Sequence, residues 1–222
     1  MFRDAALVAG KDLRIEARSR VATNQIAPFA LLVLILFAFA LDPDRGILTR
    51  ATAGLFWITV LFCTLLAVQR AFSIEAADGN RDALRLTALD PAGIFLGKAA
   101  AIALELVGLE VLLLLGVVVL YDASLDSAGL LVLTAVAATA GLASAGTLYG
   151  VLAAGLRVRE TLLPLLLLPV VAPVLIGSTR SFEAALSGSP SDGWPWVGLL
   201  SVFALVYIAL GLVAFGPLLE ES

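Results

Sequence analysis

The stretch that decides the fold is residues 99–120, AAAIALELVGLEVLLLLGVVVL, an apolar run in which Glu105 and Glu110 are the only charged residues. A helix that crosses the hydrocarbon core of a bilayer needs about 20 apolar residues. This run is therefore long enough to span a membrane, and it predicts a transmembrane helix.

Five further apolar runs of comparable length lie on either side of it. Across all 222 residues the hydrophobic fraction is 61% and the charged fraction 14%, whereas a soluble globular chain is roughly 45–50% apolar. The sequence predicts an all-α integral membrane protein with six transmembrane helices, and it excludes a soluble domain, a disordered chain and a disulfide scaffold. The other five runs are residues 25–41, 52–70, 128–155, 161–178 and 194–217.

Residue types that serve catalysis are scarce. The chain contains no histidine, the commonest general base and metal ligand, and Cys63 is its single cysteine. We therefore expect no catalytic residue, no metal site and no enzyme. The net charge of −4 argues against nucleic acid as a partner. Because no phosphate-binding P-loop motif is present, any ATP hydrolysis is expected from a separate subunit.

Lysine and arginine are divided unevenly between the two membrane faces. Eleven of the fourteen lie on the face that holds the N-terminal segment, and three lie on the other. Since positive residues are enriched on the cytoplasmic side, we expect both termini in the cytoplasm and the chain in the cytoplasmic (inner) membrane. Aromatic residues that prefer membrane interfaces fall near the expected outer face: Trp57, Trp194 and Trp196.

The N-terminal segment, residues 1–23, precedes the six-helix domain of residues 24–218 and predicts an amphipathic helix. On a helical projection its cations form one stripe and small or apolar residues form the opposite stripe. Such a helix lies along the inner membrane surface with its cations near anionic lipids; the alternative is a leader that only sets topology. The cations are Arg3, Lys11, Arg14 and Arg18, and the apolar stripe is Phe2, Ala5, Ala6, Ala9, Leu13 and Ala17.

The longest cytoplasmic connection, residues 72–98, is the candidate docking site for a partner. Asp78-Gly79-Asn80 predicts a turn, and a short helix from about Arg81 to Leu89 is expected after it, ended by a proline. A short helix with apolar side chains among charges can fit a groove on a cytoplasmic partner; the alternative is a solvated connector. The residues expected to carry the coupling are Phe72, Glu75, Asp78, Gly79, Asp82, Leu84, Leu86 and Pro91.

Polar and helix-breaking residues also lie within the predicted spans. Glu105 and Glu110 are separated by about 140° on an ideal helix, so they do not share one face. Each is either a proton, ligand or coupling site, or a hydrogen-bonded interior carboxyl. In the fifth span three prolines predict kinks, which mark either a moving element or a static bend: Pro164, Pro169 and Pro173. Gly146 and Gly150 form a G-x-x-x-G pair, for packing within the monomer or between copies.

The order of these parts resembles the cytochrome c maturation protein B family (CcmB, the haem exporter permease) over nearly the full chain. The matching elements are Lys11-Asp12-Leu13-Arg14 with Glu16 and Arg18-Ser19-Arg20, Leu36–Leu41, Gly54-Leu55-Phe56-Trp57, Phe72-x-x-Glu75-x-x-Asp78-Gly79, Ala83-Leu84, Gly97-Lys98, Gly141, Gly146-Thr147, and Glu160-x-Leu162-Leu163-Pro164 to Pro173. One departure is Glu75, where the family more usually has Asp.

The resemblance implies an ABC-2, type II exporter-like permease with an N-terminal interfacial helix and a cytoplasmic coupling helix. It further implies a homodimer, a separate ABC ATPase subunit, and a haem-handling membrane subunit with a tryptophan-rich motif. Glu75, Asp78 and Gly79 carry over as members of the family's loop motif. Haem is implied as a transported or handled species. Without a histidine ligand, no cofactor is expected to bind this chain tightly.

Three other classes of protein share some of these features. Glu75-x-x-Asp78-Gly79 is faintly similar to the signature of CDP-alcohol phosphotransferases, but the aspartates that such enzymes need on the next helix are absent from Gly93–Lys98. A proton-coupled secondary transporter would use Glu105 or Glu110, although no internal repeat is evident. A generic ABC-2 permease for a lipid or another substrate is the remaining alternative.

Overall fold

A computed structural model of the chain describes residues 1–41, 45–76, 89–121, 123, 125, 127–154 and 159–221. Every regular element in this part of the chain is helical. The elements are α1 (Phe2–Ser19), the π-helical turn η1 (Ala22–Ile26), α2 (Ala27–Ala40), α3 (Arg45–Ala76), α5 (Pro91–Tyr121), α6 (Ala128–Ala154), α7 (Arg159–Leu186), the 3-10 turn η2 (Pro190–Asp192) and α8 (Trp194–Glu221).

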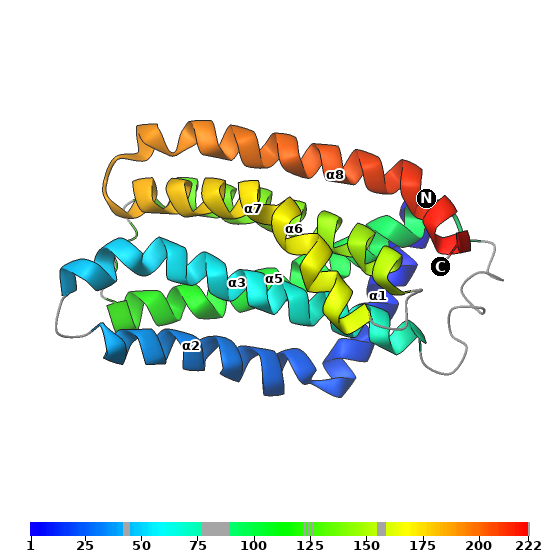
Figure 1. Cartoon of the computed structure of the whole chain (residues 1–222), viewed down its shortest axis with the longest axis horizontal. Helices are drawn as coiled ribbons and strands as arrows, with labels where there is room; N and C mark the ends of the chain where they lie inside the picture. Colours follow the sequence, from blue (N-terminus) through cyan, green and yellow to red (C-terminus); the bar gives the residue numbers. More distant parts are fainter. Residues whose placement is uncertain are drawn as a thin grey trace.

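Six helical segments of the described chain are long and apolar enough to cross a membrane, as the sequence predicts. Each overlaps one predicted span, so the all-α architecture with six spans is confirmed. The helices run side by side as a bundle, and both chain termini lie at the end where α1 is found, which we call the α1 end (Figure 1). The spans are Ala22–Ala40, Arg50–Ser73, Pro91–Tyr121, Ala128–Ala154, Thr161–Leu186 and Pro190–Glu220.

The connection between the second and third spans is shorter than the sequence predicts. Helix α3 continues to Ala76, so Phe72 and the backbone of Glu75 belong to a helix and not to a loop. The sequence places Pro91 within this connection, whereas the structure makes it the first residue of α5. The short helix that Pro91 is expected to end lies almost wholly outside the described residues and stays a prediction. Proline suits the first position of a helix, since its missing N–H has no intrahelical acceptor there.

Helix α6 is the centre of the bundle and packs against α3, α5, α7 and α8. Its glycines allow close approach: a Cβ on Gly146 would lie 2.7 Å from Cγ2 of Val68, and one on Gly150 would overlap the ring of Phe72. Both partners belong to α3 of the same chain. The G-x-x-x-G pair therefore packs within the monomer, which was one of the two readings that the sequence left open.

The tryptophans do not all behave as interfacial anchors. Trp57 is completely buried and packs edge-on against Phe56 and Phe182, with ring centroids 5.5 and 5.6 Å apart. A buried ring cannot sit among lipid headgroups, so the expectation for Trp57 is wrong. Trp194 is 49% exposed at the start of α8. Tertiary packing between α3 and α7 accounts for the difference, because a span that is buried in the bundle does not present its aromatics to lipid.

Helix α7 contains Pro164, Pro169 and Pro173 but is continuous from Arg159 to Leu186. Its ribbon changes direction between its first and second halves (Figure 1). A kink at a proline is the usual cause of such a bend. The sequence predicts Arg180–Leu186 as a separate short amphipathic piece at the outer leaflet; the structure instead shows that these residues complete α7.

Candidate functional site

The ends of the connection between α3 and α5 form the candidate site. Phe72 and Pro91 lie in the described chain, and Glu75 contributes its backbone to α3. The short helix expected from Arg81 to Leu89 falls almost wholly outside the described residues, and so do five of the predicted coupling residues: Asp78, Gly79, Asp82, Leu84 and Leu86. The site is therefore built from the residues that flank the connection.

Phe72 anchors the end of α3 in the bundle. Its side chain is buried and its ring fills the space that Gly150 of α6 leaves open. The Nζ atom of Lys98, on α5, lies 5.1 Å from the centroid of this ring. That distance is within the range of a cation–π contact. Phe72 thus joins three helices where the connection begins.

Lys98 is the most deeply buried cation in the described chain. Its side chain is 1% exposed, and its Nζ donates to Oδ2 of Asp12 at 3.2 Å. Asp12 lies on α1 and also pairs with Lys11 at 2.9 Å. A buried charge is tolerated only when it is paired. The Lys98–Asp12 ion pair therefore fastens the middle of α1 to α5.

Glu16 makes the corresponding contact with α3. One of its carboxylate oxygens lies 3.5 Å from Nε of Arg70, and the other accepts the backbone N–H of Ala22 at 2.6 Å. Arg70 is two residues before Phe72 on α3. The carboxylate thus joins the last turn of α1 both to α3 and to the start of the first span.

The first turn of α1 is tied to the residue before α5. The Asp90 N–H donates to Oδ2 of Asp4 at 3.4 Å, and the N-terminal ammonium lies 3.3 Å from Asp4 and 3.4 Å from Asp90. The Asp90 N–H lowers the pKa of the Asp4 carboxyl, and the hydrogen bond to Asp4 raises the pKa of the N-terminal ammonium. Both shifts favour the charged forms that hold this contact.

These three contacts come from one face of α1, which we call the acidic face: Asp4, Asp12 and Glu16, with Val8 buried between them. It fastens α1 to both ends of the connection, through Arg70 on one side and Asp90 and Lys98 on the other. Sequence reasoning missed this face, because it divided the helix into a basic and an apolar stripe. The signal was available, since residues 4, 8, 12 and 16 recur at helical spacing.

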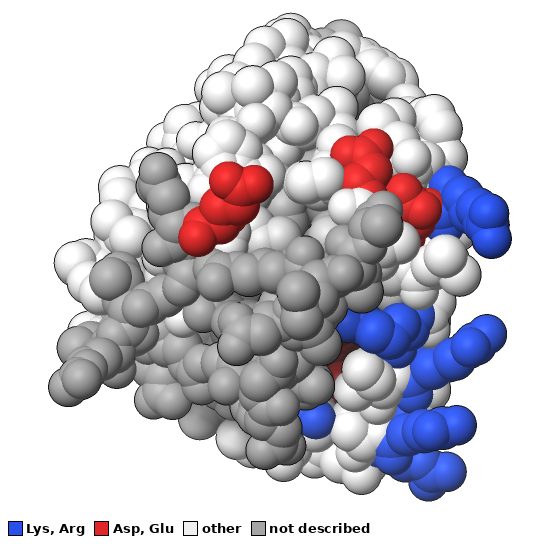
Figure 2. Space-filling model, turned by 90° about the vertical axis from the view of Figure 1, so that its right-hand side faces the viewer, with Lys and Arg blue, Asp and Glu red and all other residues white. Residues whose placement is uncertain are grey.

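On the other two faces of α1 the cations are exposed and the apolar stripe is partly covered, since Phe2, Ala6 and Ala17 are exposed whereas Ala5, Ala9 and Leu13 are half-buried. Figure 2 shows Lys and Arg side chains gathered along one side of the α1 end. On the apolar stripe Phe2 is 78% exposed. A cationic face beside an exposed apolar face is typical of a helix that lies in a membrane interface. The exposed cations of this helix and its C-cap are Arg3, Lys11, Arg14, Arg18 and Arg20.

The packing of α1 on α5 depends on two glycines. A Cβ on Gly93 would lie 2.7 Å from the carbonyl oxygen of Met1, and one on Gly97 would lie 2.6 Å from that of Ala5. Both obstacles are backbone atoms, which cannot rotate away. Only glycine therefore permits the distance at which the acidic face reaches its partners.

We predict that Gly97→Ala displaces α1 and lowers the free energy of unfolding by about 1–3 kcal/mol, the usual cost of overpacking. Gly108→Ala on the same helix is the control, since a Cβ there meets nothing within 4 Å. Cys63 is buried and is the single cysteine. Its reaction with a maleimide dye during thermal unfolding therefore reports the unfolding midpoint of each variant. Equal midpoints for the two variants would contradict the prediction.

The two intramembrane glutamates have different surroundings. Glu110 is 5% exposed and accepts a hydrogen bond from Oγ1 of Thr139 on α6 at 2.5 Å. Glu105 is half-buried and lines a small hollow with Asp12, Glu16 and Arg70. Glu110 therefore links two helices inside the bundle, whereas Glu105 lies beside the ion pairs of α1.

We expect Glu110→Gln to leave the stability within about 1 kcal/mol of the parent, because the amide oxygen can still accept from Thr139 and such interhelical bonds average about 0.6 kcal/mol. The activity of the chain in its native membrane should also persist, since Thr139 donates and the amide oxygen of glutamine can accept. The check is that activity measured beside the Cys63 unfolding curve. Loss of activity in a stable Glu110→Gln chain would favour the proton-coupling reading.

In the described part of the chain, no three side chains from His, Cys, Asp and Glu come together in a way that could hold a metal ion. The fold and the site define a class: a multi-pass helical membrane protein in which a surface helix is fastened to both ends of the connection between the second and third spans.

The particular family follows from comparison with known sequences. The family model described as CcmB protein matches residues 4–222. The chain belongs to the CcmB family.

Curated relatives cover most of the chain. A protein named Heme exporter protein B from Haemophilus influenzae is 33% identical over 184 residues, which is 82% of this chain and 83% of the relative. The protein of the same name from Bradyrhizobium diazoefficiens is 29% identical over 96% of this chain and 95% of its own length. That from Escherichia coli K12 is 30% identical over 82% and 83% respectively.

Proposed function

We propose that this chain is the membrane permease subunit of an ABC-type transporter that serves haem export for c-type cytochrome biogenesis. The observation that carries the proposal is the family match over residues 4–222, together with relatives named Heme exporter protein B. The chain supplies the membrane passage or its moving parts and does not hydrolyse ATP. Haem is a transported or handled species and not a tightly bound cofactor.

The proposed complex has further members. A separate ABC ATPase subunit binds the cytoplasmic connection, two copies of this chain form the permease, and a membrane subunit with a tryptophan-rich motif handles haem. The complex lies in the cytoplasmic membrane with both termini of this chain inside the cell. The excess of Lys and Arg on the face of the N-terminal segment supports that orientation.

The α1 end supports a mechanical role for the connection. When ATP closes the ATPase dimer, the connection moves with it and pulls on α3 and α5. Because the acidic face of α1 binds Arg70 on α3 and Lys98 on α5, the two spans and α1 move together. The membrane surface at α1 then acts as the support against which the spans are levered.

Affinity purification from native membranes in a mild detergent tests the proposal. A tagged chain should co-purify an ATPase and a membrane protein with a tryptophan-rich motif, and the preparation should hydrolyse ATP. A tagged multi-pass protein of unrelated function from the same cells is the control. A chain that purifies without a nucleotide-hydrolysing partner, and that transports without nucleotide after reconstitution, would refute it.

A further inference from the structure

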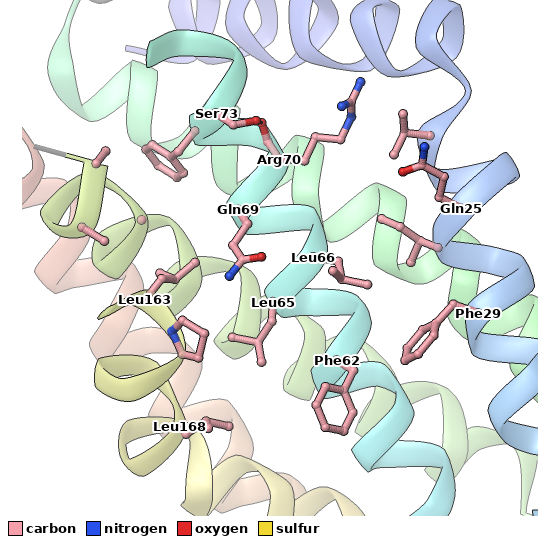
Figure 3. Close-up of a pocket in the computed structure, with 17 residues that line it drawn as sticks. Gln25, Phe29, Phe62, Leu65, Leu66, Gln69, Arg70, Ser73, Leu163 and Leu168 are labelled. Atoms are coloured by element: carbon pink, nitrogen blue, oxygen red, sulfur yellow. The ribbon is translucent and has the colours of Figure 1, made fainter. Parts of the chain in front are cut away.

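A lateral cleft opens between α2, α3 and α7, with α6 behind it. Its volume is about 750 Å³. Phe29, Phe62 and Leu66 line it and remain 38%, 46% and 40% exposed, so the cleft opens on the outer surface of the bundle. Figure 3 shows Phe29 on α2 and Phe62 on α3 beside this cleft, with Leu168 on the opposite wall.

The lining of the cleft changes along its length. Apolar side chains surround the part nearer the bilayer centre, whereas Gln25, Gln69 and Arg70 lie toward the α1 end (Figure 3). Among the described residues of the lining, Arg70 is the charged one and none is acidic. The cleft therefore has an apolar body and a polar end that contains Arg70, close to the end of the Arg50–Ser73 span.

Arg70 retains capacity to bind an anion. Its Nε is buried beside Glu16, at 3.5 Å and without a hydrogen bond, and is not accessible to a ligand. The side chain as a whole is 31% exposed, so an anion in the cleft meets the exposed part of the guanidinium. Arg70 at this end of the cleft favours a ligand with a negative group at one end.

We propose that this cleft binds an anionic phospholipid, with an acyl chain along Phe29, Phe62 and Leu66 and the phosphate at Arg70. The apolar walls require a long hydrocarbon tail, which a free phosphate lacks. The lateral opening admits that tail directly from the bilayer. The bound lipid fills the gap between α2 and α7 and links Arg70, and through it α1, to the inner leaflet. The proposal does not depend on haem transport.

The test is native mass spectrometry of the purified full chain, equilibrated with equal amounts of phosphatidylglycerol and phosphatidylethanolamine. The parent chain should retain phosphatidylglycerol preferentially. Arg70→Gln should reduce that preference about fivefold, the effect of one cation near a charged headgroup. Arg180→Gln is the matched control, because Arg180 is an exposed cation on α7 outside the cleft, paired with Glu183.

A second variant keeps the proposal testable if Arg70→Gln loosens α1. Leu66→Trp fills the cleft and leaves Arg70 in place, so it should reduce retention of both lipids by a similar factor. Leu205→Trp, at a 66% exposed position of α8, should not. An unchanged lipid preference in Arg70→Gln would overturn the proposal. So would displacement of the lipid from the parent chain by haem, or by a second copy of the chain.

Discussion

Asp12→Leu should destabilise the folded chain by about 3 kcal/mol or more, the usual cost of removing one partner of a buried ion pair. Lys98 is 1% exposed, and its Nζ lies 3.2 Å from the Asp12 carboxylate. Without that carboxylate a buried ammonium loses a charged partner that water cannot replace. The measurement is the free energy of unfolding in mixed micelles, followed through maleimide access to the buried Cys63.

The matched control is Glu183→Leu. Arg180 and Glu183 form an ion pair at the same 3.2 Å distance, but their side chains are 61% and 47% exposed. Exposed pairs contribute about 0–1 kcal/mol, so this variant should unfold almost like the parent. The double variant Asp12→Leu with Lys98→Met should recover most of the loss, because an apolar pair can replace a buried ionic pair. If Asp12→Leu and Glu183→Leu lowered the free energy of unfolding equally, the stabilising role of the buried Asp12–Lys98 ion pair would be refuted.

Asp78→Arg and Leu84→Asp should each abolish association with the ATPase subunit while leaving membrane insertion intact. Both residues lie in the connection between α3 and α5, outside the described chain. A charge reversal or a charged group in a docking surface is expected to weaken binding by more than about tenfold. The measurement is the amount of ATPase that co-purifies with a tagged chain, normalised to the amount of chain in the membrane.

Asp192→Arg provides the control for that experiment. Asp192 is exposed in η2, on the connection between α7 and α8, so the same charge reversal there should leave ATPase recovery unchanged. Protection of Cys63 reports whether each variant is folded. Undiminished ATPase recovery with Asp78→Arg and Leu84→Asp would show that the connection is not the docking site.

The candidate site could be predicted only in part. The sequence indicated the connection from its turn residues and its length, and it correctly predicted a helix within the N-terminal segment, where α1 spans Phe2–Ser19. It did not show how that helix is attached. The contacts that attach it join Asp12 to Lys98 and Asp4 to Asp90, pairs that are 86 positions apart. No local pattern encodes which distant residue a carboxylate will meet.

Helix ends and interior contacts were the other points at which local rules were insufficient. A proline suits both the residue after a helix and the first residue of a helix, so its local pattern does not separate the two positions. The structure shows that Pro91 starts α5. Trp57 is of a residue type that prefers membrane interfaces, yet it is buried against Phe182. For Trp57 the packing of neighbouring helices decided the outcome.

The sequence by itself determined that the chain crosses a membrane six times through helices alone. Length and apolarity of a run are local properties, and in a bilayer every backbone polar group must be satisfied within its own helix. Only the tertiary structure decided that α1 is fastened to both ends of the α3–α5 connection and that a lateral cleft opens beside Arg70. Those features depend on which helix faces lie together, and that choice is made by packing and ion pairing between segments far apart in the chain.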